Sequence, residues 1–589
     1  MATILRTRSP RARNSDRIAP RRTRAGSSRP APGAALRELA AARLTFGPAA
    51  AGRRRECLTA LERASLPRAG DVERLHELLC FARAYPDDRR TLALTERLLT
   101  DFARRPDLRR HAAALEDSGI AGTRICFRFF AETARWIARR WPERLHLDWD
   151  ALADTALLET LLPLLGAAAE SPALEEYDYG LRGWIQRLKG PRETDAAFLV
   201  RRLAQCVPDS FLHEKLGDFM DVPFRFESGP DTPSRTRALA SKGPVAFQAA
   251  SFPPGRPDLA TELARPARGV AALSAREGRR MIELARGAMI TRSRDLDVFA
   301  YGDPADVRLV DCGDGLAFAC IGVRPERRLL LESVYGFLTL KNRVPVGYVL
   351  TSALYGSSEI AYNVFETFRG AEAAAIYGRV LAVTCELFGS DTFTIYPYQL
   401  GANNDEALAS GAWWFYRKLG FFPRDAAVRS VMRREESLMK RDPAHRSSRA
   451  TLEKLAAENL YWSAGASRRD VIGLLPLARA GLAVTRSLSR RFGSDREAAQ
   501  RVCDGEARAR LGLAALDGWT SAERLAWKRW APLVTLLPEL ERWSDGQRAA
   551  LADVIRAKGG PRESDYVVRF DAHGELRAAL RQLVERTRE

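Results

Sequence analysis

The histidines and cysteines of this chain, the side chains that most often carry metal or nucleophilic chemistry, are scattered rather than clustered. The six histidines are His76, His111, His146, His213, His445 and His573. None of them falls between residues 275 and 440, and the eight cysteines include no Cys-x-x-Cys pair. Most of the cysteines have apolar neighbours, which is typical of reduced thiols in a core. A catalytic base in this central segment must therefore be a carboxylate, a tyrosine or a water.

Two motifs in the central segment place polar side chains where chemistry could occur. The first is Arg369-Gly370-Ala371-Glu372-Ala373-Ala374, which opens a helical run that ends near Phe388. The unpaired N–H groups and the positive dipole end of a helix N-terminus form an anion site, and small residues let backbone amides approach a phosphate closely. The second motif, about forty-five residues later, is Phe415-Tyr416-Arg417-Lys418-Leu419-Gly420-Phe421. The first motif thus places an arginine and small residues at a helix start, and the second supplies a phenol.

Hydrophobic patterns predict the elements that must position these motifs. The predicted helices cover residues 277–289 and 371–388, and the predicted strands cover 306–312, 315–322, 329–340, 344–352, 358–365 and 392–396. The turn Lys341-Asn342-Arg343 joins two of these strands into a hairpin. This order predicts a meander of strands that leads into the helix at residue 371.

A strand, an Arg-Gly turn, a helix, a second strand and a helix that closes on Tyr-x-Lys-x-Gly-Phe resembles the GNAT acyltransferase superfamily. The resemblance covers residues 275–440, little more than a quarter of the chain. In that superfamily a bent meander of antiparallel strands leads to a fourth strand, which splays from its neighbour and feeds a helix whose N-terminus receives the acyl-CoA pyrophosphate. By this resemblance the fourth strand covers residues 359–364, and the phosphate-binding turn covers residues 369–374.

The resemblance implies an acyl-CoA co-substrate, either acetyl-CoA or another acyl-CoA. The residues that would bind it are Val364, Arg369, Gly370, Ala371, Ala373 and Ala374. Glu372 stands where the superfamily has a glycine, and a carboxylate at a helix N-terminus would repel a pyrophosphate. Either Glu372 turns outward and the co-substrate binds through backbone amides and Arg369, or this site does not hold CoA.

The resemblance also implies which residues would be catalytic. Tyr416 would protonate the departing thiolate, since a phenol close to the sulfur is a serviceable general acid. The base would be Glu359 or Glu366, on or near the fourth strand. Tyr362 and Asn363 would contact the substrate. An amine would then attack the thioester directly while backbone N–H groups of the splayed strand polarise the carbonyl, and no metal is expected.

Three functions stay open at this point. The first is an acyl-CoA-dependent N-acyltransferase that acts on an unknown amine-bearing acceptor, either a small molecule or a protein. The second is a GNAT-like domain without its co-substrate that serves as a scaffold or interaction protein, which Glu372 and the large helical flanks favour. The third is a transferase that uses another activated donor, such as an aminoacyl-tRNA.

The length of 589 residues is too great for one hydrophobic core, so several domains are expected. Composition and periodicity predict a disordered basic tail over residues 1–33, a helical domain over 34–222, a Pro/Gly-rich linker over 223–274 and a second helical domain over 445–589. The resemblance implies a GNAT-like domain over 275–440. The predicted fold class is α+β, with a central GNAT-like mixed β-sheet module flanked by two mainly α-helical regions.

The basic charge of the chain is partly concentrated at its N-terminus. Of the net charge of +19, residues 1–33 supply +8, and the rest is spread thinly along the chain. Nucleic-acid binding is therefore an open alternative that the sequence does not favour. No uninterrupted apolar run reaches the ~18 residues of a membrane span, and we expect a cytoplasmic protein.

A short motif occurs once in each of the predicted helical flanks. Lys189-Gly190-Pro191-Arg192-Glu193-Thr194-Asp195 returns as Lys558-Gly559-Gly560-Pro561-Arg562-Glu563-Ser564-Asp565. The pattern predicts a shared helix–turn–helix connection, in which glycine ends one helix and threonine or serine caps the next. The alternative is that two related helical elements flank the central segment.

Overall fold

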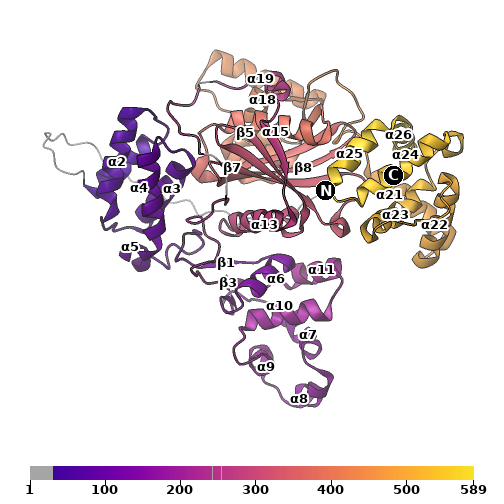
Figure 1. The fold of residues 1–589 in the computed structure, drawn as a ribbon, viewed down its shortest axis with the longest axis horizontal. Coiled ribbons are helices and arrows are strands. Elements are labelled where there is room, and N and C mark those ends of the chain that lie inside the picture. Colours follow the sequence, from indigo (N-terminus) through magenta and orange to yellow (C-terminus); the bar gives the residue numbers. More distant parts are fainter. Residues whose placement is uncertain (1–30, 242, 244, 254, 589) are drawn as a thin grey trace. The chain divides into compact units, whose positions relative to one another are not determined.

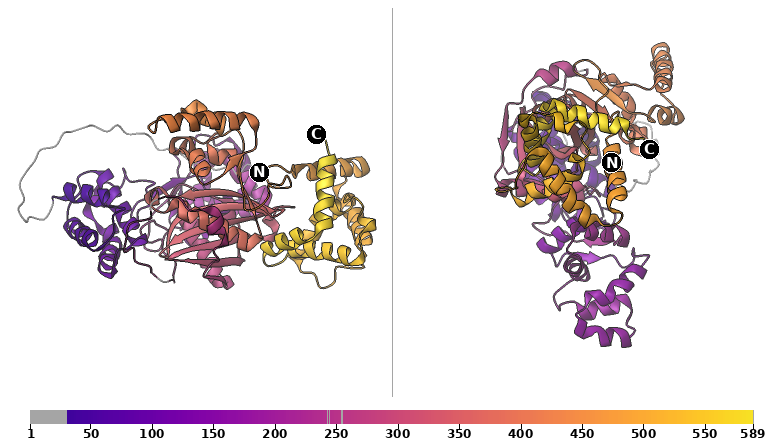
Figure 2. Two further views of the ribbon diagram at one scale, coloured as in Figure 1. Left: turned by 90° about the horizontal axis from the view of Figure 1, so that it is seen from above. Right: turned by 90° about the vertical axis from the view of Figure 1, so that its right-hand side faces the viewer.

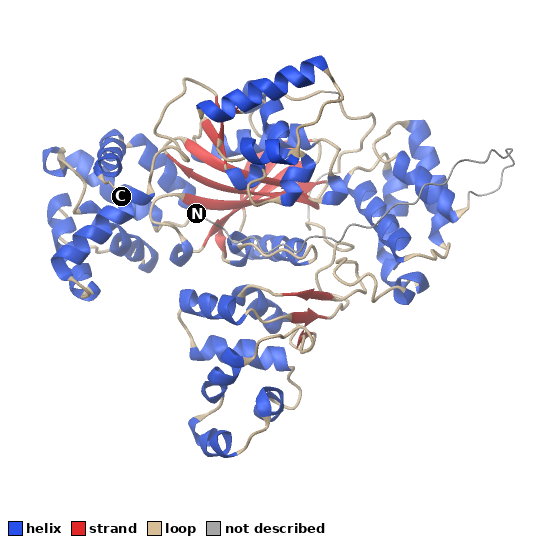
Figure 3. Ribbon diagram, turned by 180° about the vertical axis from the view of Figure 1, so that it is seen from behind, coloured by secondary structure: helices blue, strands red, loops and turns tan. Residues whose placement is uncertain are grey.

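The computed structural model describes residues 31–588 except residues 242, 244 and 254. The chain is an α+β protein, as the sequence predicts, with a large mixed sheet in its central part and helical regions before and after it (Figures 1 and 3). It divides into two compact units. Unit 1 contains the chain up to Phe252 together with Arg280–Tyr301 and Lys341–Pro345, and unit 2 contains the rest. The predicted basic tail lies outside the described residues up to residue 30.

Unit 1 is mainly helical, as predicted for this part of the chain. Its helices are α1 Pro32–Ala41, α2 Pro48–Glu62, α3 Ala69–Ala84, α4 Arg89–Asp101, η1 Phe102–Arg104, α5 Pro106–Arg110, α6 Ala131–Arg140, α7 Ala156–Leu165, η2 Ala168–Glu170, α8 Ser171–Glu176, α9 Gly180–Leu188, α10 Asp195–Cys206, α11 Ser210–Met220 and α14 Asp297–Ala300. Helix α13, Ala275–Ile290, begins in unit 2 and ends in unit 1.

Unit 1 also contains a small antiparallel sheet that the sequence pattern does not reveal. Its strands are β1 Ile125–Phe127, β2 Leu145–Leu147 and β3 Phe224–Phe226, in the order β1-β3-β2. Phe224 and Phe226 point into the core of this unit, where Trp141 packs on Phe226. Strands of three residues are too short to show a hydrophobic alternation. The sequence pattern therefore predicts only helices over residues 34–222 and a linker from residue 223, where β3 in fact lies.

Unit 2 carries the large sheet and the C-terminal helices. Its strands are β4 Gly269–Ala272, β5 Gly302–Gly313, β6 Leu316–Val323, β7 Ser333–Lys341, β8 Val344–Leu354, β9 Ser357–Val364, β10 Thr392–Ile395, β11 Phe422–Pro423 and β12 Leu460–Ser463. Its helices are α12 Leu259–Ala264, η3 Pro325–Arg327, η4 Glu366–Phe368, α15 Ala373–Phe388, α16 Pro397–Leu400, α17 Asp405–Ser410, α18 Ala412–Lys418, α19 Ala426–Arg441, α20 Arg449–Leu455, α21 Ala478–Phe492, α22 Arg496–Leu511, α23 Ser521–Val534, η5 Leu540–Arg542, α24 Asp545–Lys558, α25 Glu563–Ala572 and α26 Gly574–Arg586. The tip of the β7–β8 hairpin, residues 341–345, belongs to unit 1.

The strands of the large sheet follow the order β11-β12-β10-β9-β8-β7-β6-β5-β4. Strands β8 and β9 are antiparallel, β9 and β10 are parallel, and β12 pairs antiparallel with both β10 and β11. The meander predicted for the central segment is therefore present. Strand β12 follows the predicted boundary at residue 440 and lies in the segment predicted as helical from residue 445, so the sheet takes in more of the chain than the sequence pattern indicates.

One predicted strand begins later than its apolar pattern indicates. The pattern places its start at residue 329, whereas β7 begins at Ser333. The carbonyl of Leu330 accepts a hydrogen bond from Trp530 Nε1 at 3.0 Å. The carbonyls of Leu331 and Glu332 accept from Lys558 Nζ at 3.2 and 3.0 Å. C-terminal side chains thus take the backbone acceptors that a neighbouring strand would otherwise use.

The C-terminal helices, yellow in Figures 1 and 2, are tied to the sheet by a buried polar network. Lys558 Nζ lies 2.6 Å from Glu563 Oε1, and both side chains are almost fully buried. Tyr335 of β7 donates its hydroxyl proton to Asp306 of β5 and accepts a hydrogen bond from the backbone N–H of Ser564 at 2.9 Å. Burial lowers the pKa of Lys558 and raises that of Asp306. Because these groups are buried, removal of any one of them would leave its partner buried without a compensating interaction and would destabilise unit 2.

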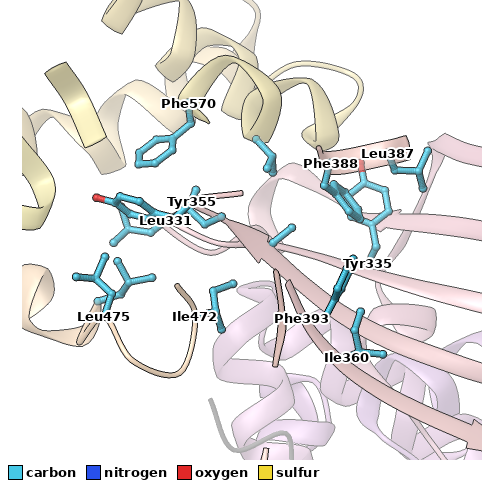
Figure 4. Packing of buried hydrophobic residues seen from close by; sticks show 14 of the residues in the cluster. Leu331, Tyr335, Tyr355, Ile360, Leu387, Phe388, Phe393, Ile472, Leu475 and Phe570 are labelled. Atoms are coloured by element: carbon cyan, nitrogen blue, oxygen red, sulfur yellow. The ribbon is translucent and has the colours of Figure 1, made fainter. Parts of the chain in front are cut away.

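Apolar packing reinforces the same contact (Figure 4). Phe570 of α25 packs edge to face on Tyr355, with ring centroids 5.2 Å apart, at the turn between β8 and β9. The hydroxyl of Tyr355 donates to the carbonyl of Arg577, and the N–H of Gly356 donates to Asp571. Both turn residues have left-handed backbone angles, φ 59° at Tyr355 and 61° at Gly356. The C-terminal helices therefore stabilise a turn that a tyrosine adopts only at a cost.

The repeated motif forms a helix–turn–helix connection in both places, as predicted. In unit 1 it joins α9 to α10, and Thr194 caps α10 through a hydrogen bond from the N–H of Ala197. In unit 2 it joins α24 to α25, where Gly559 lies so close to Ala522 that a Cβ atom would be 2.4 Å from the carbonyl oxygen. Ser564 lies inside α25 rather than capping it. The second copy thus fits a helix contact and contributes Glu563 to the buried network.

Glu563→Gln is expected to lower the unfolding free energy of unit 2 by about 3–5 kcal/mol, because it leaves the buried Lys558 ammonium without its carboxylate. The measurement is chemical denaturation of the full chain, followed by tryptophan fluorescence. Asp565→Asn is the matched control, since its ion pair with Arg562 is exposed and contributes about 0–1 kcal/mol. An equal effect of both variants would contradict a buried ion pair. The double variant Lys558→Met with Glu563→Leu is expected to recover most of the loss.

Candidate functional site

The parallel pair β9 and β10 separates part-way along its length. The two strands pair only from Ser357 with Thr392 to Glu359 with Thr394. Beyond that point β9 continues to Val364, paired with β8 alone, whereas β10 ends at Ile395. Pro397 is the first residue of α16 and has no N–H to donate, so the chain cannot continue as a sheet strand. The end of β10 therefore leaves one edge of β9 without a partner strand over residues 360–364.

The register of β9 determines which backbone groups face this open edge. The two-residue turn at Tyr355 and Gly356 closes on the pair Leu354 and Ser357. Hydrogen bonds to β8 then alternate along the strand, so the even-numbered residues direct their N–H and C=O groups away from β8. The contacts agree with this register, since the N–H of Phe365 donates to Val346 at 3.0 Å while the carbonyl of Val364 accepts from Arg369 Nε at 3.3 Å.

Tyr416, the candidate general acid, lies near this edge of β9. It lies in α18, its side chain is 3% exposed, and its phenol lies close enough to the backbone N–H of Tyr362 for that N–H to lower the pKa of the phenol. Burial raises the pKa of Tyr416, and the Tyr362 N–H only partly offsets this effect. The ring packs edge to face on Tyr377 at 5.4 Å and on Phe421 at 5.9 Å. The phenol is therefore protonated at neutral pH and aimed at a backbone donor.

Tyr362 joins β9 to the first turn of α15. Its hydroxyl donates to the carbonyl of Ala373 at 3.0 Å, and its ring lies 5.3 Å from that of Tyr377. Burial raises the pKa of Tyr362, and the neighbouring Tyr416 and Glu372 raise it further. The side chain predicted to contact the substrate thus lies on the α15 side of the strand, next to the predicted phosphate turn.

Glu359 lies on the other side of β9, since successive side chains of a strand alternate. Its carboxylate accepts a hydrogen bond from Ser352 of β8 at 3.3 Å. Burial raises the pKa of Glu359 to about 7, and the charge of Glu332 contributes in the same direction. The Glu359 carboxylate also helps to raise the pKa of Tyr396, after burial, so these two side chains lie near each other. A carboxyl group with this pKa can accept a proton near neutral pH.

The other two side chains predicted near the fourth strand differ in burial. Asn363 shares the Glu359 side of β9, and its Oδ1 atom is buried with no hydrogen-bond partner among the described residues. Glu366 lies in η4 and is exposed to solvent. Burial therefore distinguishes Glu359 from the exposed Glu366 as the candidate base.

The predicted phosphate turn leads into α15 with Glu372 at the N-cap position, and no side chain caps the helix. The first helical hydrogen bond runs from the N–H of Ile376 to the carbonyl of Glu372 at 2.9 Å. The N–H groups at 373–375 therefore precede the hydrogen-bonded part of the helix. Gly370 has a left-handed φ of 81°, which suits a glycine at this turn.

Arg369, the predicted phosphate ligand, is engaged by the protein itself. Its Nη2 atom forms an ion pair with Glu406 of α17, and its Nε atom donates to the carbonyl of Val364. The two ion-paired side chains are 42% and 48% exposed, so water screens their attraction. Sequence reasoning missed Glu406 because it is distant along the chain. It also missed Pro397 as the residue that ends β10, although proline is a visible signal for the end of a strand.

A surface hollow lies away from these residues, on the C-terminal helices. It has a volume of about 460 Å³, and His573 and Gln547 contribute to its wall. His573 Nε2 hydrogen-bonds the carbonyl of Gln547 at 2.9 Å, and Nδ1 accepts from the N–H of Leu576 at 3.2 Å. Nδ1 thus caps α26 and Nε2 links it to α24, so both ring nitrogens have partners and this histidine stabilises the helices.

Comparison of the chain with protein-family models, curated proteins and solved structures gave no match. Within the described residues, no group of three or more His, Cys, Asp or Glu side chains is arranged to hold a metal ion. No single helix in the described part of the chain has the length and apolar composition needed to cross a membrane, and the one helix pair that passes such a test, residues 156–165 with 168–176, is bent by 109°.

Glu359→Gln is expected to change how stability depends on pH. Between about pH 4.5 and 7 the folded chain retains the Glu359 proton that the unfolded chain releases, so wild-type stability falls as pH rises through this range. Glutamine removes this contribution, which amounts to about 3 kcal/mol. The measurement is the unfolding free energy of both proteins from pH 4.5 to 8. The Gln variant should gain relative to wild type with rising pH, and a constant difference would mean that Glu359 ionises normally.

Proposed function

We propose that this protein is an N-acyltransferase, which moves an acyl group from a thioester donor to an amine. The observation that supports this proposal best is that the buried phenol of Tyr416 lies near the backbone N–H of Tyr362, at the edge of β9 that β10 leaves without a partner strand. A backbone donor and a buried acid then face the same space, which is the pair of groups that thioester aminolysis needs. The resemblance to GNAT acyltransferases, drawn from the sequence motifs, points to the same chemistry.

In this proposal the thioester carbonyl accepts a hydrogen bond from the N–H of Tyr362, which lies near the Tyr416 phenol in the ligand-free chain. The amine nitrogen attacks the carbonyl carbon, so that a C–N bond forms and the C–S bond breaks. The proton lost from the amine passes to Glu359, directly or through water, and Tyr416 gives its proton to the departing sulfur. The products are an amide and a free thiol, and solvent returns both residues to their starting states.

The protonation states of the two residues fit these opposite roles. Burial raises the pKa of Glu359 to about 7, which allows it to act as a base near neutral pH. The raised pKa of Tyr416 keeps the phenol protonated until the thiolate forms beside it. Asn363 shares the Glu359 side of β9 and would help to orient the acceptor amine. The acceptor would accordingly approach from the side opposite Tyr362 and α15.

The proposed donor is an acyl thioester such as acetyl-CoA, entering from the α15 side. The N–H groups of Ala373 and Ala374 precede the hydrogen-bonded part of the helix and would face its phosphates, together with the turn at Gly370 and Ala371. Val364 directs its carbonyl to the same edge, where Arg369 already contacts it. The strength of this phosphate contact is treated in the next subsection.

A scaffold without catalytic activity is the second candidate. The observations that favour it are the burial of Tyr416, only 3% exposed, and the ion pair that engages Arg369. Calorimetry with acetyl-CoA and with S-acetyl-pantetheine separates the two candidates, because a scaffold would bind neither thioester while remaining folded.

Tyr416→Phe is expected to lower kcat by about 10²–10⁴-fold while donor binding stays within twofold, because only the acid is removed. The matched control is Tyr377→Phe, since the Tyr377 oxygen is buried in the same aromatic cluster with no described hydrogen-bond partner. The assay follows thiol release from acetyl-CoA and from S-acetyl-pantetheine in the presence of a panel of primary amines. Equal turnover by both variants would exclude Tyr416 as the acid.

A further inference from the structure

The predicted phosphate turn has carboxylates close to it, whereas a site that binds an anion strongly is lined by cationic and N–H groups. Glu406 forms an ion pair with Arg369, so one face of this guanidinium already has an anionic partner. Glu372 stands at the N-cap of α15, and its carboxylate is near enough to Tyr362 to raise the pKa of that phenol. Both carboxylates lie where a diphosphate would have to approach the helix. The Glu372 carboxylate does not hydrogen-bond the N–H groups of α15, but its charge at the positive end of the helix dipole opposes the approach of a phosphate.

The open edge of β9, in contrast, suits an extended chain with amide groups. Residues 360, 362 and 364 direct their backbone groups toward the place that a continued β10 would occupy. There the N–H of Tyr362 faces the Tyr416 phenol and the carbonyl of Val364 accepts from Arg369 Nε, so a ligand strand would displace these two side chains. A ligand with alternating N–H and C=O groups can hydrogen-bond to such an edge as an added strand does. The amide-containing arm of a pantetheine thioester has these groups, and its sulfur end would lie toward Tyr416. The nucleotide end of CoA would reach the turn where Glu372 and Glu406 stand.

We infer that this protein recognises its donor through the acyl-pantetheine arm and gains little from the nucleotide diphosphate of CoA. This inference rests on the N-acyltransferase proposed above and names the donor class for the same site. The ligand chemistry is an acyl group on a pantetheine thioester. It can come from a free pantetheine thioester or from an arm attached to a carrier protein, and the test distinguishes these sources.

The expected magnitudes follow from the exposure of the groups. An exposed ion pair and a carboxylate near a helix terminus each change an anion's affinity by about threefold, and their removal together changes it by about tenfold. The wild type should therefore bind acetyl-CoA within about tenfold of S-acetyl-pantetheine. The double variant Glu372→Gln with Glu406→Gln should bind acetyl-CoA about tenfold more tightly and S-acetyl-pantetheine with unchanged affinity.

The experiment is calorimetric titration of the full chain with acetyl-CoA, with S-acetyl-pantetheine and with an acetylated acyl carrier protein. Asp405→Asn is the matched control for the double variant, because Asp405 is on the same helix α17 but pairs with Arg449. It should leave the ratio of the two small-molecule affinities unchanged. Carrier protein that binds more tightly than S-acetyl-pantetheine would assign the arm to a carrier, and equal binding would assign it to a free thioester.

Two results would overturn the inference in distinguishable ways. Wild-type affinity for acetyl-CoA more than 100-fold above that for S-acetyl-pantetheine would mean that the turn is a built phosphate site, and the proposed acyltransferase would stand without this donor class. Absence of binding by all three donors, to the wild type and to the double variant, would remove both the inference and the proposed function.

Discussion

The end of β10 at Ile395, two residues before Pro397, is the constraint on which the candidate site depends. A strand inside a sheet has its backbone N–H and C=O groups hydrogen-bonded to a neighbouring strand along both edges. A backbone donor that can bind a ligand therefore exists only where the pairing stops. Here a proline that begins a helix stops it after Ile395, while β8 keeps β9 extended to Val364. The result is a short length of strand with a satisfied edge and an open edge. Tyr416 can reach the N–H of Tyr362 only because that edge is open.

The rest of unit 2 keeps β9 in this register. A shift by one residue would exchange the two faces and place Glu359 on the α15 side. The turn at Tyr355 and Gly356 fixes the register, and its left-handed backbone is stabilised by Phe570, Asp571 and the carbonyl of Arg577. The C-terminal helices thus contribute to the site without touching it. These helices are attached to the sheet in part by the buried pair of Lys558 and Glu563, which lies at the connection between α24 and α25.

Local patterns in the sequence were sufficient for part of this picture. The α+β class, the meander, α15 and the placing of Glu359 on β9 follow from hydrophobic periodicity, because each is a property of neighbouring residues. The tertiary contacts of these elements do not follow from hydrophobic periodicity. Glu406 meets Arg369, and β12 inserts between β10 and β11, through contacts between residues distant along the chain. The raised pKa of Glu359 likewise comes from burial, which no local pattern encodes.

The short sheet in unit 1 could not be predicted from the sequence for a different reason. Its strands have three residues each, too few for a period of two to emerge from the sequence, and they are recognisable only once Phe224 and Phe226 are seen in the core. The repeated Lys-Gly-Pro motif was predictable only in its local structure. The sequence indicates its local form, a connection between two helices, but gives no sign that the second copy places Glu563 in a buried network with Lys558.

Hydrogen–deuterium exchange with a bound donor analogue tests the central claim most directly. The analogue is a ketone in which a methylene group separates the pantetheine sulfur from the carbonyl, so that no transfer can occur. We predict slower exchange of the backbone amides in residues 359–365, where the Tyr362 N–H would hold the carbonyl, and no change in β5 and β6. Binding of the analogue without protection of residues 359–365 would contradict the account, because the open edge of β9 would then not be the place where the thioester lies.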